Sequence, residues 1–335
     1  MVRRSMYAAI SLILIGLLLS GCGSSSNQGA ANNGSPTSSN TAPAASDGSN
    51  GSNGSNGSNQ SGNGQSDSGQ TGEEQQHRIV STTVAITEVL HELGLDVVGV
   101  PSTAKTLPER YSSAVEVGNP MSPDMELVKS LKPTHVFSVT TLQYDLEKLF
   151  SNVAIEASFL DFTSLDAMKG EIKKLGEMFD RQAQAEALIA SYDEKIAQIK
   201  QEVADQQPPS VLILMGIPGS YLVATEHSYI GDLVKQLGGT NIVTDSDVEF
   251  VSSNTEYLHQ GNPDIILRAA HGMPDEVIEM FDQEFKTNDI WKHFNAVKND
   301  RVYDLPEDFF GTTGNLAADE ALDILADMLY PDRKG

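Results

Sequence analysis

MELVKSLKP at residues 125–133, followed by THVFSV at residues 134–139, has a counterpart in TEYLHQGNP at residues 255–263, followed by DIILRA at residues 264–269. In both stretches a glutamate, Glu126 or Glu256, lies seven positions before a proline. Proline ends a helix, and the apolar residues after it favour a strand. Such units also arise independently in α/β proteins, so coincidence is the other interpretation. The equal spacing favours two similar α/β lobes.

The stretch between these two units has the pattern of helices. One helix face is indicated by apolar residues spaced three and four apart: Leu165, Met168, Ile172, Leu175 and Phe179. After a break near Asp180, a second helix is predicted over residues 182–203. At ~1.5 Å per residue this helix is roughly 33 Å long, about the diameter of a domain. It is therefore long enough to bridge two lobes.

Strand and helix signals alternate on both sides of this helical stretch. On the amino-terminal side a helix is predicted over residues 83–93, and strands over residues 78–82, 97–100, 135–139 and 154–160. On the carboxyl-terminal side the signals cover residues 210–215, 221–224, 228–237, 264–269 and 301–305, before a final helix over residues 316–329. We expect an α/β fold of two similar lobes bridged by one long rigid helix, with a ligand cleft between them. The expected boundaries are residues 77–163, 164–206 and 207–335 for the N-terminal lobe, the helical segment and the C-terminal lobe.

The first 22 residues resemble a bacterial lipoprotein signal. Arg3 and Arg4 precede an apolar run, which ends in Leu19-Ser20-Gly21 before Cys22, the single cysteine of the chain. The apolar run is shorter than the ~20 residues that a membrane-spanning helix needs. We expect residues 1–21 to be a signal peptide and Cys22 to carry the lipid, at the extracytoplasmic face of the bacterial cell membrane. An ordinary signal peptide or a membrane helix is the alternative.

Composition separates residues 22–76 from the rest of the chain. This segment consists mainly of Gly, Ser and Asn, so we expect a disordered linker, which as a Gly/Ser coil would span roughly 40 Å. The remainder contains no cysteine, which excludes disulfides and thiolate metal sites there. The formal net charge of −24 opposes binding to nucleic acid. The lipid anchor is then the expected membrane contact, and we expect a monomer.

From residue 77 to residue 335 the chain resembles the helical-backbone class of ABC-importer substrate-binding proteins, which bind cobalamin, ferric siderophores or haem. A closer resemblance, to the haem-binding lipoproteins of iron-regulated surface determinant systems, rests on VPST at 100–103, GNPMSPD at 118–124, PGSYLVAT at 218–225 and RAAHGMP at 268–274. It implies a lipid-anchored importer component that carries haem (iron protoporphyrin IX) between its lobes. The implied partners are the membrane subunits of an ABC permease and an upstream haem donor at the cell surface.

In that family a methionine of the first lobe and a histidine of the second hold the haem iron. The matching residues here are Met121 and His271. Thioether and imidazole are a known axial pair for haem iron, and closed ligation on both faces suits a carrier and not an enzyme. By residue type alone, a methionine such as Met121 is more often a gap-filling side chain, and a histidine such as His271 is more often a capped or partly exposed imidazole.

Haem also carries two propionates, which need hydrogen-bond donors. The predicted helix start at residue 83 offers the backbone amides of Thr82, Thr83, Val84 and Ala85. Lys105 is a second candidate donor. Four apolar residues are either ordinary core or loop residues or contacts to the porphyrin face: Leu142, Met215, Phe309 and Phe310.

Glu126 and Glu256 have a different implied role. In this class one acidic residue on each lobe pairs with arginines of the permease, and exposed pairs of this kind set orientation more than affinity. The alternative is that both are solvated glutamates, favoured at a helix start by the helix dipole.

The sequence also bears on other classes of function. The chain contains no Gly-rich phosphate loop, no His-Glu-x-x-His pair and no Gly-x-Ser-x-Gly elbow, which argues against the commonest nucleotide, zinc and serine enzymes. A ferric-siderophore or cobalamin carrier, or a surface adhesin without transport, are the alternatives that remain open.

Overall fold

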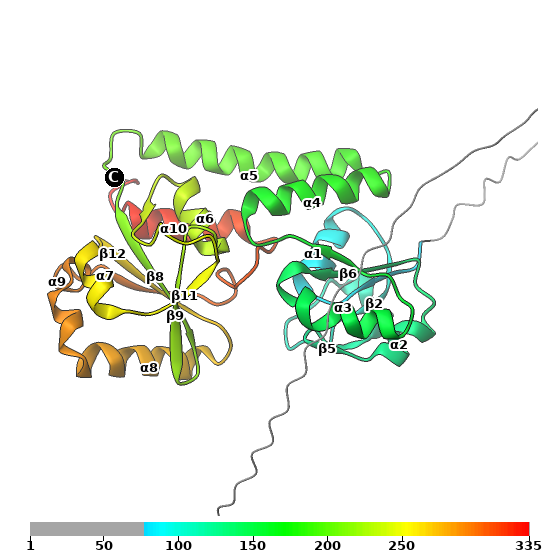
Figure 1. The fold of residues 1–335 in the computed structure, drawn as a ribbon. Coiled ribbons are helices and arrows are strands. Elements are labelled where there is room, and N and C mark those ends of the chain that lie inside the picture. The colour runs from blue at the N-terminus through cyan, green and yellow to red at the C-terminus, as the bar shows by residue number, and fades with distance from the viewer. Residues whose placement is uncertain (1–76, 335) are drawn as a thin grey trace, which may run out of the picture. The chain divides into compact units, whose positions relative to one another are not determined.

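The computed structural model of the chain describes residues 77–334, and of residues 255–257 it describes the backbone only. The predicted signal peptide (1–21), the predicted acylation of Cys22 and the predicted linker (22–76) lie outside the described residues. Residues 77–334 form two large sheets covered by helices, one small two-stranded sheet, and a pair of helices alongside the large sheets (Figure 1). No helix in this described part is both long and apolar enough to span a membrane.

The first sheet is built entirely from parallel strands, in the order β3-β2-β1-β6-β7. Its strands are β1 (Ile79–Ser81), β2 (Val97–Val100), β3 (Val115–Glu116), β6 (His135–Val139) and β7 (Ser158–Leu160). Helices α1 (Val84–Glu92), α2 (Met125–Ser130) and α3 (Gln143–Asn152) connect them, with the small hairpin β4 (Gly118–Asn119) and β5 (Ser122–Pro123) and 3₁₀ turns at Glu109–Tyr111 and Thr140–Leu142. Parallel sheets need cover on both faces, which explains why Ile79 and Val80, pointing to opposite faces, are both buried.

The second sheet mixes parallel and antiparallel pairs, in the order β11-β9-β8-β12-β13, with β10 also paired to β8. Its strands are β8 (Ser210–Ile217), β9 (Ser220–Ala224), β10 (Thr240–Asn241), β11 (Phe250–Ser252), β12 (Ile265–Ala270) and β13 (Val302–Leu305). The accompanying helices are α6 (Tyr229–Gln236), α7 (Thr255–Gly261), α8 (Pro274–Thr287), α9 (Asn295–Lys298) and α10 (Ala318–Leu329), with a 3₁₀ turn at Asp289–His293.

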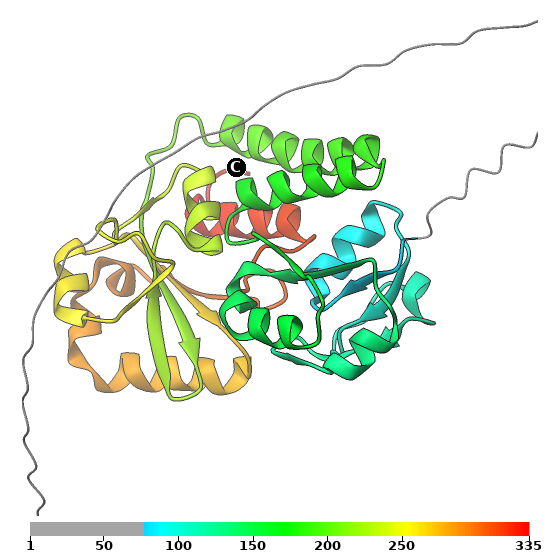
Figure 2. The same ribbon diagram turned by 45° about the vertical axis from the view of Figure 1, so that its right-hand side comes forward.

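Two helices, α4 (Leu165–Met178) and α5 (Gln182–Glu202), connect the sheets and lie side by side in both views (Figures 1 and 2). The Ser164 hydroxyl caps α4 by accepting from the amide of Ala167 at 3.0 Å. The turn between the helices passes through Asp180, whose φ of 55° is left-handed. One continuous apolar core then joins α1 of the first lobe, the buried face of α5, and α6 and α10 of the second lobe.

The predicted two-lobed α/β fold with a long bridging helix is confirmed, and α5 ends one residue before the predicted end at 203. The repeated units are α2 followed by β6 and α7 followed by β12. The predicted strand over 154–160 is wrong in its first half, because Ala154 has a φ of 59° and belongs to the turn after α3. The helices α3 and α8 are not among the predicted elements, and the predicted lobe boundaries stay predictions.

A buried guanidinium ties the end of α5 to α10. The Arg333 side chain is 1% exposed and contacts Glu202 at 2.6 Å, Asp323 at 3.0 Å and Asp327 at 2.6 Å. Partial burial opposes ionisation of both aspartates, but hydrogen bonds from Lys195 and Arg333 to Asp323, and from Lys334 and Arg333 to Asp327, hold the pKa of each carboxyl below its usual range. The cluster therefore stabilises the fold where its carboxylates are ionised.

We expect Arg333→Met to lower the thermal unfolding midpoint by roughly 4–8 °C at neutral pH, about 2 kcal/mol, because Glu202 then loses its ion-pair partner, while Asp323 and Asp327 each keep only a lysine. An aspartate whose pKa is lower in the folded state stabilises the fold at pH values above its pKa in the unfolded chain, which is ~4. This contribution is lost as the pH falls through the pKa of the folded state. The difference in unfolding midpoint between Arg333→Met and the unsubstituted protein should therefore become smaller at acidic pH. Arg110→Met, which removes the exposed pair with Asp96 and one hydrogen bond to the Gly94 carbonyl, is the control in calorimetry. Equal midpoints for the two variants would contradict this role for Arg333.

Candidate functional site

A cavity of about 850 Å³ opens between the two sheets, within the usual size range of small-molecule sites. Its lining follows the carboxyl ends of parallel strands, the edge where open α/β sheets bind ligands. From the first lobe these segments follow β1, β2 and β6, together with the β4–β5 hairpin. From the second lobe they follow β12 and β13, together with the start of β11.

Met121 reaches the cavity from the tip of the β4–β5 hairpin. The two strands pair through Gly118 with Pro123 and Asn119 with Ser122, which leaves Pro120 and Met121 as the loop. The Asn119 side-chain oxygen accepts from the Met121 amide at 2.9 Å, an Asx-type contact that fixes the turn. Met121 is 66% exposed, so its thioether lines the cavity and belongs to no core.

His271 reaches the same cavity from the other lobe, directly after β12. Its amide donates to the Gly216 carbonyl of β8 at 2.8 Å, which extends the sheet by one further hydrogen bond. The next two residues, Gly272 and Met273, are both left-handed, with φ of 74° and 50°. The Gly272 amide donates to Glu307 at 2.9 Å, and α8 then begins at Pro274. The turn leaves His271 exposed on the cavity wall.

The start of α1 supplies amides to the cavity, with one correction to the predicted set. The Thr82 amide donates to the Phe137 carbonyl at 3.0 Å, so it is not free, and Thr82 does not line the cavity. Thr83, Val84 and Ala85 do line it, and within the described chain their amides have no hydrogen-bond acceptor. The Thr83 hydroxyl is buried, also without a partner there, and makes no capping bond. A helix start with unsatisfied donors suits an anionic group.

The rest of the lining is acidic. Five carboxylates line the cavity: Glu88, Glu92, Glu249, Glu307 and Asp308. Among the described residues Lys105 is the only lysine or arginine in the lining, and its ammonium lies 3.2 Å from Asp308 of the other lobe. Burial raises the pKa of Glu88, which Lys105 partly offsets. Burial and the neighbouring Asp161 raise the pKa of Glu249.

The remaining candidates from the sequence fall into three groups. Leu142 lines the cavity, whereas Met215 and Phe310 are buried in the core and Phe309 packs against that core. Glu126 is exposed in the first turn of α2. Glu256 lies in the first turn of α7, where the structure describes the backbone only.

Some lining residues were not among the candidates, notably Phe250 and the carboxylates Glu88, Glu249 and Glu307. The sequence around these residues contains no recognisable motif. They come together only when the two lobes pack, so the sequence gives no sign that they share a site. Glu307 follows a predicted strand end, which is the one signal that could have pointed to it. Within residues 77–334 no group of three or more His, Cys, Asp or Glu side chains is arranged to hold a metal ion.

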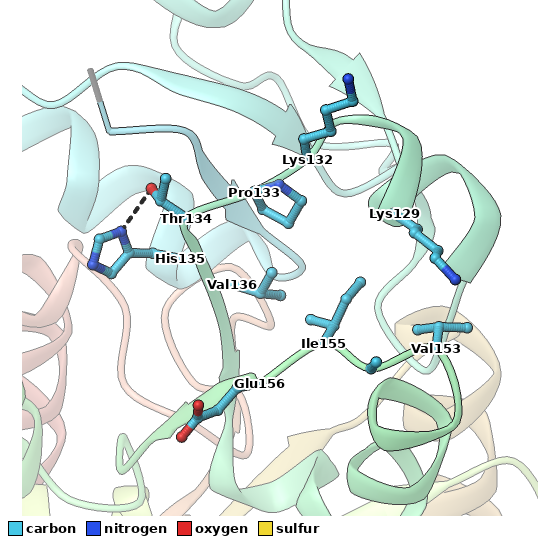
Figure 3. A pocket seen from close by; sticks show the side chains of 10 residues that line it. Lys129, Lys132, Pro133, Thr134, His135, Val136, Val153, Ile155 and Glu156 are labelled. Carbon is cyan, nitrogen blue, oxygen red and sulfur yellow. Dashed lines mark hydrogen bonds between the residues drawn. The ribbon is translucent and has the colours of Figure 1, made fainter. Parts of the chain in front are cut away.

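A second hollow of about 430 Å³ lies at the opposite edge of the first sheet, where β6 begins (Figure 3). Thr134 and His135 share a 2.9 Å hydrogen bond on one side of it, and Lys129 and Lys132 extend in different directions on the other. Partial burial, together with His77, lowers the pKa of His135. Polar groups do not converge in this hollow, so the interlobe cavity is the better candidate.

Known proteins resemble the chain along most of its length. The high-affinity haem uptake system protein IsdE of Staphylococcus aureus strain Newman is 50% identical over 270 residues, which are 80% of this chain and 92% of that protein. The crystal structure of S. aureus IsdE complexed with haem has a TM-score of 0.72 at 51% identity, covering 76% of this chain and 99% of that one. That of an ABC transporter substrate-binding protein from Listeria monocytogenes EGD-e has a TM-score of 0.74 at 57% identity, covering 77% and 100%.

The family comparison agrees with the observed fold. The sequence profile of the periplasmic binding proteins matches residues 79–309, which begin at β1 and end beyond β13 in the loop that lines the cavity. This range includes both sheets, the bridging helices, and the hairpin and turn that carry Met121 and His271. The chain therefore belongs to the periplasmic binding protein family.

Proposed function

We propose that this chain is the haem-binding component of an ABC importer, and that its interlobe cavity holds haem with Met121 and His271 as the two axial ligands of the iron. The observation that carries the proposal is that these two side chains line one cavity from opposite lobes. The resemblance to IsdE, whose crystal structure contains haem, supports the choice of ligand.

The ligand chemistry fits a carrier. A thioether and an imidazole hold iron on both faces of the porphyrin, and the thioether favours the reduced iron more than a second imidazole would. Because both axial positions are filled, no iron position is open to oxygen or another substrate. We therefore assign the protein no enzymatic activity on haem.

The propionates go to the start of α1. The amides of Thr83, Val84 and Ala85 and the buried Thr83 hydroxyl are donors without an acceptor in the described chain, and Lys105 adds a positive charge. Carboxylates line much of the remaining wall and repel the negatively charged propionates. This contrast in charge gives the bound haem one preferred orientation.

Delivery depends on the amino-terminal segment and on one helix start in each lobe. Cys22 carries the lipid that holds the protein at the extracytoplasmic face of the membrane, and residues 22–76 let the folded part reach its permease. Glu126 and Glu256 start helices that run antiparallel to β6 and β12, so both lie at the carboxyl edge of their sheets, where the cavity opens. There they pair with basic residues of the permease, and an upstream surface protein supplies the haem.

We expect His271→Ala and Met121→Ala to shift the Soret band and to speed haem loss by roughly tenfold or more, because each removes one iron ligand. Met121→His should keep iron six-coordinate but lower its reduction potential. Absorption spectroscopy, redox titration and haem transfer to apomyoglobin measure these effects. Met178→Ala is the matched control, since this exposed thioether of α4 lies outside the cavity lining.

Two results would reject this assignment. One is that His271→Ala and Met121→Ala keep the spectrum and haem-loss rate of the unsubstituted protein. The other is a colourless protein that refuses hemin and binds a ferric siderophore.

We expect Glu126→Ala combined with Glu256→Ala to reduce haem uptake by cells while leaving the haem spectrum of the purified protein unchanged. The reason is that permease docking and haem ligation use different groups. Glu147→Ala, which removes an exposed glutamate of α3, is the control. Undiminished uptake in the double variant would remove the docking role.

We expect Cys22→Ser to move the protein from the membrane fraction to the soluble extracellular fraction and to abolish labelling by a fatty-acid analogue. The anchor is the one membrane contact proposed here, so fractionation and labelling should change together. A Cys22→Ser protein that still fractionates with membranes would show that something else anchors it.

A further inference from the structure

Arg268 is a charged residue in an otherwise apolar strand. It lies in β12 among Ile265, Ile266, Leu267 and Ala269, all of them buried, and its own side chain is only 9% exposed. A buried charge is costly unless it is paired and hydrogen-bonded. The residues around Arg268 therefore indicate what the charge is for.

The Arg268 guanidinium contacts two elements besides its own strand. It forms two hydrogen bonds of 2.7 Å to the carboxylate of Asp304, its register partner in β13. A third, of 3.0 Å, goes to Asp282 of α8. The rings of Phe281 and Phe285, also in α8, lie 5.6 and 5.3 Å from the guanidinium carbon. Planar, multidentate contact of this kind is specific to arginine.

These contacts hold both ends of the turn that presents His271. That turn comprises His271, Gly272 and Met273 and joins β12 directly to α8. Arg268 lies three residues before His271, and Asp282 lies in the α8 turns that follow it. The guanidinium thus links the strand before the turn to the helix after it.

A second contact fixes the same helix against the strand that anchors His271. A β-carbon at Gly216 would lie 2.4 Å from Val277 and 2.8 Å from Phe281, so α8 rests directly on the backbone of β8 there. The carbonyl of the same Gly216 accepts the His271 amide at 2.8 Å. Any tilt of α8 is therefore transmitted to the backbone of His271.

From this arrangement we infer that Arg268 is a positioning residue, which holds α8 against β12 and so sets the direction of the His271 imidazole toward the iron. The inference rests on the proposed function, because it needs His271 to be a ligand. Ligand side chains must be held within about 0.5 Å of their working positions, and residues that touch no ligand supply that precision. Arg268 does not line the cavity, so it acts only through the turn.

The cleanest test removes only the link to the helix. Asp282→Asn weakens the Arg268–α8 contact but keeps Asp304, and Asp282 is 66% exposed, so the protein should fold. Asp327→Asn is the matched control, since Asp327 is 50% exposed and contacts the other buried guanidinium, Arg333, far from the turn in sequence. We expect Asp282→Asn to speed haem loss to apomyoglobin by roughly tenfold. It should also change the g-values of the low-spin ferric haem, measured by electron paramagnetic resonance. The control should stay within about twofold, as for exposed charge pairs.

Arg268→Lys and Arg333→Lys form a second matched pair. Both replacements lose the planar fork of a buried arginine and should lower the unfolding midpoint. Only Arg268→Lys should alter the g-values and haem-loss rate, which a purely structural role would leave unchanged. If Arg268→Lys does not fold, Asp282→Asn alone decides.

The two proposals fail differently. If Asp282→Asn has the same g-values and haem-loss rate as the unsubstituted protein, the positioning role of Arg268 is overturned. The haem assignment is unaffected by that result, provided that the spectrum of the unsubstituted protein shows the signature of thioether–imidazole ligation. Absence of that signature in the unsubstituted protein would overturn the haem assignment and this inference with it.

Discussion

The arrangement of the site depends on the packing of both lobes against one bridging helix. The buried face of α5 includes Tyr192, Ile196 and Ile199, and it belongs to the same apolar core as α1 of one lobe and α6 and α10 of the other. Separating the lobes from this helix would expose that core to water, which costs about 25 cal/mol of free energy for each Å² of apolar surface exposed. The carboxyl edges of the two sheets therefore keep facing one cavity, and large lobe movements are disfavoured.

Charge limits what this cavity can hold. An acidic wall repels anions, yet the start of α1 offers amides, a buried hydroxyl and the nearby Lys105. Backbone donors keep their partial charge at any pH, and the dipole of α1 adds to it. A ligand with an apolar body and anions at one end satisfies both regions at once, whereas an evenly charged anion does not. This asymmetry is the physical reason to prefer a porphyrin with two propionates over a more highly charged chelate.

Much of the fold followed from the sequence because its signals are local. The predicted strands at 97–100 and 135–139 match β2 and β6, since short apolar runs bounded by turns specify strands directly. Helix α8 was missed although Val277, Phe281 and Phe285 recur every four residues after Pro274. The Thr82 amide was misjudged because its bond to Phe137 depends on the pairing of β1 with β6, which only the folded chain reveals.

The site was predictable only in part, and mostly through family resemblance. Residue type did not single out Met121 or His271, whereas a charge within the apolar run of β12 was a visible sign that Arg268 has partners. The cavity lining comes mainly from loops, strand ends and exposed helix turns, while the buried core lies behind it. Loop substitutions can therefore change the cargo without disturbing the scaffold, so an ancestral importer protein could diversify toward new nutrients by small, separately tolerated steps.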